Sequence, residues 1–340
     1  MDVKLIKQNI KKYLVKKNAY LTIGGQFNLQ SQIESVSYFD FIGDTIVSLD
    51  KNQKIINNND FPNISSNYFF KLSSASREYF ILVDSQSFDS ETFLYTQEAL
   101  YSLTEKRIIF EQLNLGDVIF DNFILSGKGK NEINVFSIVN LETLSKLNLG
   151  NVMISTDTSE KPHQVSEFCG IHENTLVCTL NSGAILLLGI QSGEVKRFFP
   201  DAKFPRQLYA KKDEPHIYCG LFSRRYIEID ILKGEIIKDI SIEDQLRAIK
   251  GIPEADHCWF SVGFSVLYDD KIYFLSETNF IGVFDPATGK IIDYHEFEFD
   301  KSKGQQLRGG KENLQVKEGK IYCLDTLGNL YELQSDQKYL

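Results

Sequence analysis

Eight basic side chains in the second half of the chain are the strongest candidates for binding chemistry. They lie in or beside segments that connect predicted β-strands, and recognition residues concentrate in such loops on a rigid scaffold. Acidic residues are interspersed with them, so a protein-docking face of mixed charge is the functional interpretation and ordinary solvated loop charge is the plainer one. The candidates are Arg224, Arg225, Arg247, Lys250, Lys301, Lys303, Arg308 and Lys311.

Histidine and cysteine spacings do not predict a catalytic or metal centre. His163, Cys169 and His172 are close in sequence, but their spacing matches no standard zinc pattern. The sequence also lacks a serine nucleophile elbow, a Walker loop and a His-Glu-x-x-His helix. We therefore predict no catalytic residue, no metal and no cofactor. If the chain is an enzyme, its acid–base candidates are His216, His257 and His295.

Composition indicates a packed globular protein. The 340 residues are 42% hydrophobic and 24% charged, which is ample for a buried core. The net charge of -9 disfavours a nucleic-acid partner, because the average field repels polyanions. Five cysteines, an odd number placed mostly in apolar runs, suggest small buried side chains in a reducing compartment. With no signal-peptide pattern or membrane-spanning run, we expect a cytoplasmic protein without a membrane partner.

Positioning of the candidate loops depends on a β-hairpin unit that recurs seven times. The clearest copy has strands at Lys271–Leu275, Phe280–Phe284 and Lys290–Tyr294. The spacing between units averages close to the roughly 40 to 50 residues of one propeller blade, which predicts four strands in each. The anchor residues of the units are Ile46, Phe93, Phe123, Val177, Ile217, Ile272 and Ile321.

The last unit ends before its outermost strand, so another segment must cover its edge. We predict that Ala19–Ile23 supplies that strand. Val3, Ile6, Ile10 and Tyr13 recur at helical spacing among lysines, which predicts a basic helix or arm over residues 1–18. Residues 19–340 would then form one β-propeller domain.

The turn Asp285-Pro286-Ala287-Thr288-Gly289 combines a capping Asp, a Pro of fixed φ and a Gly that accepts positive φ. Degenerate copies occur at Asp230–Gly234, Gln191–Gly193 and Asn140–Thr143. These turns resemble those joining the third and fourth strands in the PQQ-like and WD40-like repeat β-propellers. The resemblance implies an all-β fold, a seven-bladed propeller of four-stranded antiparallel blades, closed by an N-terminal strand.

The resemblance does not extend to function. The blade-locking tryptophans of PQQ-dependent dehydrogenases are absent, since Trp259 is the single tryptophan, and so is their adjacent cysteine pair. Fold alone does not fix activity. We favour a non-catalytic protein-binding module, in one version a bacterial immunity protein that neutralises a toxin. The alternatives are a propeller hydrolase, lactonase or lyase with a site at the central channel, and a structural subunit of a larger assembly.

Overall fold

The computed structural model divides the chain into two compact units. The terminal unit comprises Met1–Gln32 and Phe204–Leu340, and the middle unit comprises Ile33–Lys203. We describe each unit by itself. The described residues are 1–14, 19–22, 27–28, 36–42, 45–52, 55, 61, 64, 67–75, 78–91, 94–112, 115–151, 163–199, 208–222, 224–253, 262–276, 279–310 and 313–334.

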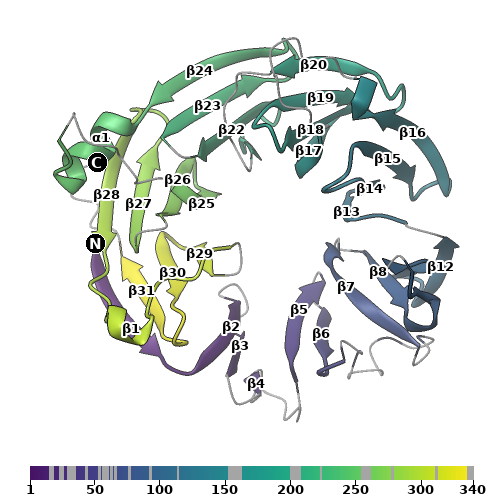
Figure 1. Cartoon of the computed structure of the whole chain (residues 1–340), viewed down its shortest axis with the longest axis horizontal. Coiled ribbons are helices and arrows are strands. Elements are labelled where there is room, and N and C mark those ends of the chain that lie inside the picture. Colours follow the sequence, from purple (N-terminus) through teal and green to yellow (C-terminus); the bar gives the residue numbers. More distant parts are fainter. Residues whose placement is uncertain are drawn as a thin grey trace. The chain divides into compact units, whose positions relative to one another are not determined.

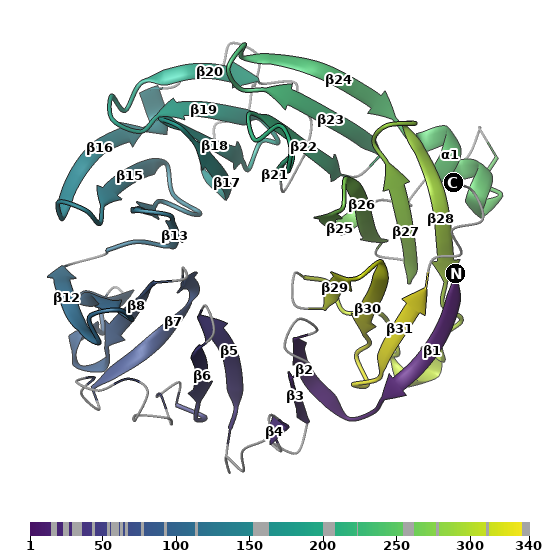
Figure 2. The same cartoon turned by 180° about the vertical axis from the view of Figure 1, so that it is seen from behind.

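The terminal unit holds three four-stranded antiparallel sheets that stand side by side (Figures 1 and 2). The first comprises β21 (Tyr209–Ala210), β22 (Ile217–Phe222), β23 (Arg225–Asp230) and β24 (Glu235–Ser241). The second comprises β25 (Val262–Tyr268), β26 (Lys271–Ser276), β27 (Phe280–Asp285) and β28 (Lys290–Glu296). The third comprises β29 (Leu314–Lys317), β30 (Lys320–Leu324), β31 (Leu330–Gln334) and β1 (Asp2–Lys7).

Shorter elements complete the description of this unit. The helix α1 (Glu243–Lys250) connects β24 to β25, and the 3-10 turn η4 (Lys301–Lys303) follows β28. A three-stranded ladder comprises β2 (Ile10–Leu14), β3 (Ala19–Thr22) and β4 (Phe27–Asn28). Among the described residues of the chain, no helix has the length and apolarity needed to span a bilayer.

The middle unit contains three further four-stranded antiparallel sheets. One has the order β12 (Arg107–Gln112), β11 (Glu98–Ser102), β8 (Tyr79–Asp84) and β7 (Tyr68–Ala75). The next comprises β13 (Val118–Phe120), β14 (Phe123–Ser126), β15 (Glu132–Ser137) and β16 (Glu142–Asn148), and ends at the 3-10 turn η3 (Leu149–Asn151). The third comprises β17 (Val165–His172), β18 (Thr175–Leu180), β19 (Ile185–Gly189) and β20 (Val195–Phe199).

Two hairpins of two strands also belong to the middle unit. The strands β5 (Tyr38–Ile42) and β6 (Thr45–Leu49) pair with each other. A small ribbon of β9 (Phe88–Asp89) and β10 (Leu94–Tyr95) is inserted between β8 and β11, after the 3-10 turn η2 (Ser85–Ser87).

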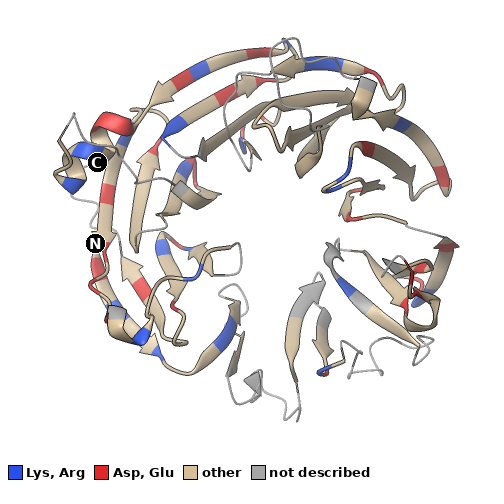
Figure 3. Cartoon of the chain, in the orientation of Figure 1, with Lys and Arg blue, Asp and Glu red and all other residues tan. Residues whose placement is uncertain are grey.

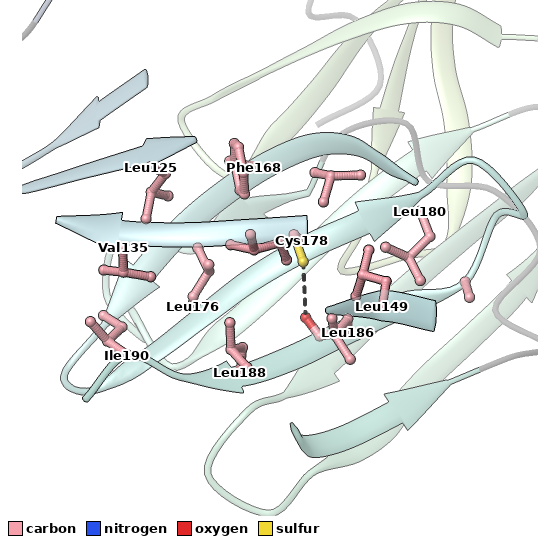
Figure 4. Close-up of a cluster of buried hydrophobic side chains, with 13 residues drawn as sticks. Leu125, Val135, Leu149, Phe168, Leu176, Cys178, Leu180, Leu186, Leu188 and Ile190 are labelled. Atoms are coloured by element: carbon pink, nitrogen blue, oxygen red, sulfur yellow. Dashed lines mark hydrogen bonds between the residues drawn. The ribbon is translucent and has the colours of Figure 1, made fainter. Parts of the chain in front are cut away.

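Each core lies between the faces of successive sheets. Every residue of β18 and β19 is buried, because apolar neighbours cover both faces of this sheet, whereas most residues of the outer strand β20 are exposed or half-buried. Figure 4 shows the cluster around these strands, in which Leu176, Leu186 and Leu188 meet Leu125 and Val135 of the preceding sheet. Burial of each such side chain contributes roughly 1.5 to 3 kcal/mol.

The Asp-capped turns have the predicted place and geometry. Asp285 Oδ1 accepts the Ala287 N–H at 3.0 Å, Oδ2 accepts the Thr288 hydroxyl at 2.9 Å, and Gly289 has a φ of 69°. Asp230 accepts the N–H groups of Leu232 and Lys233 in the same way. The four turns named from the sequence join the third and fourth strands of their sheets, as predicted.

The N-terminal segment covers the edge of β31, but with a different strand from the one predicted. Residues Asp2 to Lys7 pair antiparallel with β31, in register from Asp2 opposite Gln334. The helix predicted within residues 1–18 is therefore wrong over β1 and β2. The backbone groups of β31 require partners, and pairing with them outweighs the helical spacing of the apolar residues. Residues 15–18 lie outside the described residues.

The strand predicted to cover this edge pairs elsewhere. Ala19–Thr22 bonds to β2 and β4, so it does not cover β31, and Ile23 lies outside the described residues. The ladder that it forms was not among the seven predicted units. The seven-blade count, closure of a ring and the domain boundary at residue 19 stay predictions.

One further assignment needs correction. The second unit was anchored on Phe93, but Leu94–Tyr95 beside it belongs to the inserted ribbon, and β7 takes the fourth place in the four-stranded sheet. Phe93 lies outside the described residues. Lys71, Ser73 and Ser74 interrupt β7, so its sequence does not form an apolar run that would predict a strand.

Gly282 in β27 provides a test of the packing in the terminal unit. A Cβ atom there would lie 2.3 Å from the Phe274 ring, which belongs to the neighbouring strand β26. We expect Gly282→Ala to lower the free energy of unfolding by about 1 to 3 kcal/mol in a urea titration, because the buried ring must move. Gly309→Ala is the control, since its Cβ would meet nothing within 4 Å. Equal stability of the two variants would contradict this packing.

Candidate functional site: a charged cleft in the terminal unit

Three turns from two neighbouring sheets surround a cleft of about 350 Å³. They follow β21, β25 and β27, which place them at one end of their sheets because alternate turns of an antiparallel sheet share an end. Figure 3 shows residues of both charges along the ribbon of these strands and turns. The lining residues are Lys211, Asp213, Glu214, Glu228, Lys238, Asp269, Asp270, Lys271, Asp285, Pro286 and Ala287.

Glu228 forms the inner part of the cleft and is only 6% exposed. It lies in the middle of β23, opposite Lys238 of β24 in the ladder. The Tyr226 hydroxyl, two residues earlier and hence on the same face, donates to Glu228 Oε1 at 2.5 Å. Lys211 Nζ lies 2.9 Å from the same oxygen and Lys238 Nζ lies 3.7 Å from it. The buried carboxylate is therefore well compensated.

The protonation of these groups follows from their surroundings. Burial is the largest influence on the pKa of Glu228, and it acts to raise it. Hydrogen bonds from Tyr226 and Lys211 and the charges of two lysines act in the opposite direction and together outweigh burial. The pKa of Glu228 therefore lies below 4.5. Burial raises the pKa of Tyr226, and it raises that of Cys219 to about 12. Near neutral pH the network thus holds a carboxylate, a neutral phenol and a thiol, with no activated nucleophile among them.

The rim of the cleft is acidic. Asp213, Glu214, Asp269 and Asp270 are exposed, and none of them forms an ion pair with a described residue. Asp269 and Asp270 form the β25–β26 turn with φ of 49° and 55°, a conformation that Asp and Asn tolerate better than most residues. The lining as a whole has six carboxylates against three lysines, two of which contact Glu228. The cleft therefore favours a cation.

Basic residues predicted to bind a partner lie at the other end of these sheets. Arg224 and Arg225 flank the β22–β23 turn, Arg247 and Lys250 lie on α1, and Lys301 begins η4. Lys311 lies outside the described residues.

Most of these side chains contact acidic groups or carbonyl oxygens of the same unit. Arg224 and Arg247 contact Glu243 at 2.9 and 2.7 Å. The remaining pairs are Arg225 with Asp239, Lys250 with Glu296, Lys303 with Asp300, and Arg308 with the carbonyls of Lys11 and Thr326. A role for this face in binding stays a prediction.

Histidine residues named for an enzymatic site do not come together. His216 precedes β22 at the end of the sheet where the cleft lies, whereas His295 lies near the far end of β28, with its ring edge-on to Phe297 at 4.8 Å. His257 lies outside the described residues. Within the part of the chain that the structure describes, no three His, Cys, Asp or Glu residues are grouped to hold a metal ion.

The cleft itself was missed in the sequence. Its residues come from three separate turns and from the strands β23 and β24, whereas the residues predicted to bind a partner lie at the opposite end. The available signals were the Asp269-Asp270 pair and the charged run from Lys211 to Glu214, each beside an apolar strand. Neither of these sequence features indicates by itself that the two turns lie close together in the fold.

Solved structures show the fold of this chain. The computationally designed Ika8 protein is 12% identical, with a TM-score of 0.56 over 97% of this chain and 94% of the other. BamB from Moraxella catarrhalis is 11% identical, with a TM-score of 0.52 over 98% of both chains. The β-propeller domain of Cps50 (Swd1) from Myceliophteria thermophila is 11% identical, with a TM-score of 0.41 over 61% of this chain and 60% of that domain.

No protein-family model and no curated protein matches the sequence. Similarity at this level of identity concerns the fold alone. The predicted all-β fold of four-stranded antiparallel blades is confirmed, as is the fold-level resemblance to the PQQ-like repeat β-propellers, through BamB.

Glu228→Gln tests the network inside the cleft. We expect the variant to lose about 1 to 3 kcal/mol of stability near neutral pH, because Lys211 and Lys238 lose their charged partner. The folded-state pKa of Glu228 lies below 4.5, so its contribution is present above 4.5 and is lost as the pH falls through the folded-state value.

The gap in unfolding free energy between wild type and Glu228→Gln, measured by urea titration, should therefore narrow as the pH falls below 4.5. Glu194→Gln, a change at an exposed site, is the control. A gap that stays constant across this range would show that Glu228 is not stabilised as a carboxylate.

Proposed function

We propose that this β-propeller is a non-catalytic module that binds a basic protein partner at the charged cleft. The observation that carries the proposal is the set of four rim carboxylates, at Asp213, Glu214, Asp269 and Asp270, which form no ion pair with described residues.

Two of the three lysines that line the cleft are engaged inside it and do not cancel the charge of the rim. Lys211 contacts Glu228, and Lys238 contacts Glu228 and donates to the Pro286 carbonyl. Their positive charge is thus directed inward, while the rim carboxylates face solvent. A concave site with an excess of one sign of charge concentrates the opposite sign and accelerates association.

The size of the cleft favours a side chain over a large ligand. A volume of about 350 Å³ is at the low end for small-molecule sites and admits one or two long side chains. A lysine or arginine of a partner could place its charged head among the rim carboxylates and its aliphatic stem along Pro286 and Ala287. The net charge of -9 for the chain acts in the same direction.

A toxin is one specific form of such a partner. Many features of the site suit any basic protein, and an immunity protein would use the acidic rim to cover a basic toxin surface. This version rests on charge complementarity between an acidic binder and a cationic target.

The central test removes charge without changing the turn. Asp269→Asn with Asp270→Asn keeps the residue shape and the tolerance for positive φ. We expect the double variant to capture at least tenfold less of the basic partner than the wild type does from native lysate at low salt. This difference should shrink as salt is raised, because ions screen the attraction of the rim carboxylates.

Asp121→Asn is the matched control, because Asp121 is also an exposed turn aspartate with positive φ, at 48°. Unchanged capture by the double variant would remove the cleft from the proposal. Loss of capture after charge reversal at Arg224 and Arg247 alone would assign binding to the opposite end of the sheets.

The toxin version has its own test. Co-expression of this protein with the product of the neighbouring gene should restore growth if that product is toxic, and the Asp269→Asn, Asp270→Asn variant should protect less well. Growth that is not restored by the wild-type protein would exclude this version and leave binding of another basic protein in place.

A further inference from the structure

The β9–β10 ribbon presents aromatic side chains on the surface of the middle unit. Phe88 of β9 is 46% exposed and Tyr95 of β10 is 37% exposed. Their rings lie 5.2 Å apart, and Tyr95 also contacts the Phe69 ring of β7 edge-on at 4.9 Å. We call these three residues the aromatic cluster. Exposed clusters of this kind mark interaction surfaces more often than single exposed rings do.

The ribbon is an insertion that the sheet itself does not need. β8 and β11 pair directly with each other from Val83 opposite Glu98, so a tight turn could connect them. Instead, the connection over residues 85–97 contains a 3-10 turn and two short strands. An insertion in a connecting loop, built around exposed aromatic residues, is typical of a binding element.

Hydrogen bonds fix the base of the ribbon. Asp84 Oδ1 accepts the Gln86 N–H at 2.9 Å, and Ser87 Oγ donates to the Asp84 carbonyl at 2.7 Å. The Gln97 N–H donates to Ser87 Oγ at 2.9 Å, and the Thr96 N–H donates to the Ser87 carbonyl at 3.0 Å. Binding through a preorganised element loses less conformational entropy than ordering a free loop.

The charged residues of the segment that contains the ribbon are all acidic, although Lys71 and Arg107 from outside it pair with Glu98 and Glu105. Residues 78–105 contain no lysine, arginine or histidine. Two carboxylates, Asp89 and Glu91, flank the aromatic cluster within the ribbon. The acidic residues of this segment are Glu78, Asp84, Asp89, Glu91, Glu98 and Glu105. A partner surface that receives the ribbon must therefore supply positive charge beside an apolar site.

We propose that the ribbon inserts Phe88 and Tyr95 into an apolar groove of a partner protein whose rim carries lysine or arginine. Aromatic side chains that fill a pocket inside a ring of polar contacts are the usual anchors of protein interfaces. This inference goes beyond the proposed function, because it uses residues of the middle unit and stands without the cleft.

The test uses a library of random twelve-residue peptides displayed on phage, selected against the full-length protein. We expect the enriched peptides to combine apolar residues with lysine or arginine. Phe88→Ser and Tyr95→Ser should each weaken a synthetic enriched peptide at least tenfold by fluorescence polarisation. Asp89→Asn with Glu91→Gln should weaken it several-fold and reduce its dependence on salt.

Val139→Ser is the control, because Val139 is 75% exposed in the same unit but lies in the β15–β16 turn. The Asp269→Asn, Asp270→Asn variant should bind the peptide as the wild type does. The test of the ribbon is therefore independent of whether the cleft binds a partner. Thermal melting of each variant verifies folding.

Three outcomes would overturn the proposal. Enriched peptides that bind Phe88→Ser as tightly as wild type would place recognition elsewhere. Concentration-dependent dimerisation in sedimentation velocity, lost in Phe88→Ser, would make a second copy of this chain the occupant. Binding to phosphatidylglycerol vesicles that Phe88→Ser abolishes would make the ribbon a membrane contact.

Discussion

Backbone pairing at the edge of β31 is the constraint on which the third sheet of the terminal unit depends. An edge strand presents N–H and C=O groups that need partners, and β1 supplies them along five register positions. The same pairing brings Val3 against a core that includes Ile321 and Leu333. Met1 then reaches the neighbouring sheet, where its amino group lies 3.4 Å from Asp293. One strand thus satisfies a sheet edge and contributes to a core.

Charge is arranged differently at the two ends of the sheets in this unit. At the cleft, buried Glu228 draws Lys211 and Lys238 inward and leaves rim carboxylates exposed to solvent. At the opposite end, Arg224 and Arg247 converge on Glu243 in the first turn of α1, where a carboxylate also suits the helix dipole. The acidic end therefore keeps more charge available for a partner than the basic end does.

Sequence patterns predict an element well where local and tertiary preferences agree. The strands around Ile272 and Ile321 and the turn at Asp285 were predictable, because apolar runs and turn residues mark them. The strand β1 was not predictable, because its apolar residues have helical spacing. The edge of β31 with which it pairs is far away in the sequence. The cleft was not predictable either, since Asp269 and Glu228 become neighbours only when two sheets pack together. Local sequence patterns do not indicate which distant residues lie close together in the fold.

Pairing of β1 with β31 also has a consequence for synthesis of the chain. The strand β1 is synthesised long before β31, so its backbone groups bond to water or form transient contacts until the residues between the two strands have been made. Contacts of such large sequence separation form slowly. The third sheet should thus be the last part of the terminal unit to become native, and its apolar strands are the ones that a chaperone would meet during translation.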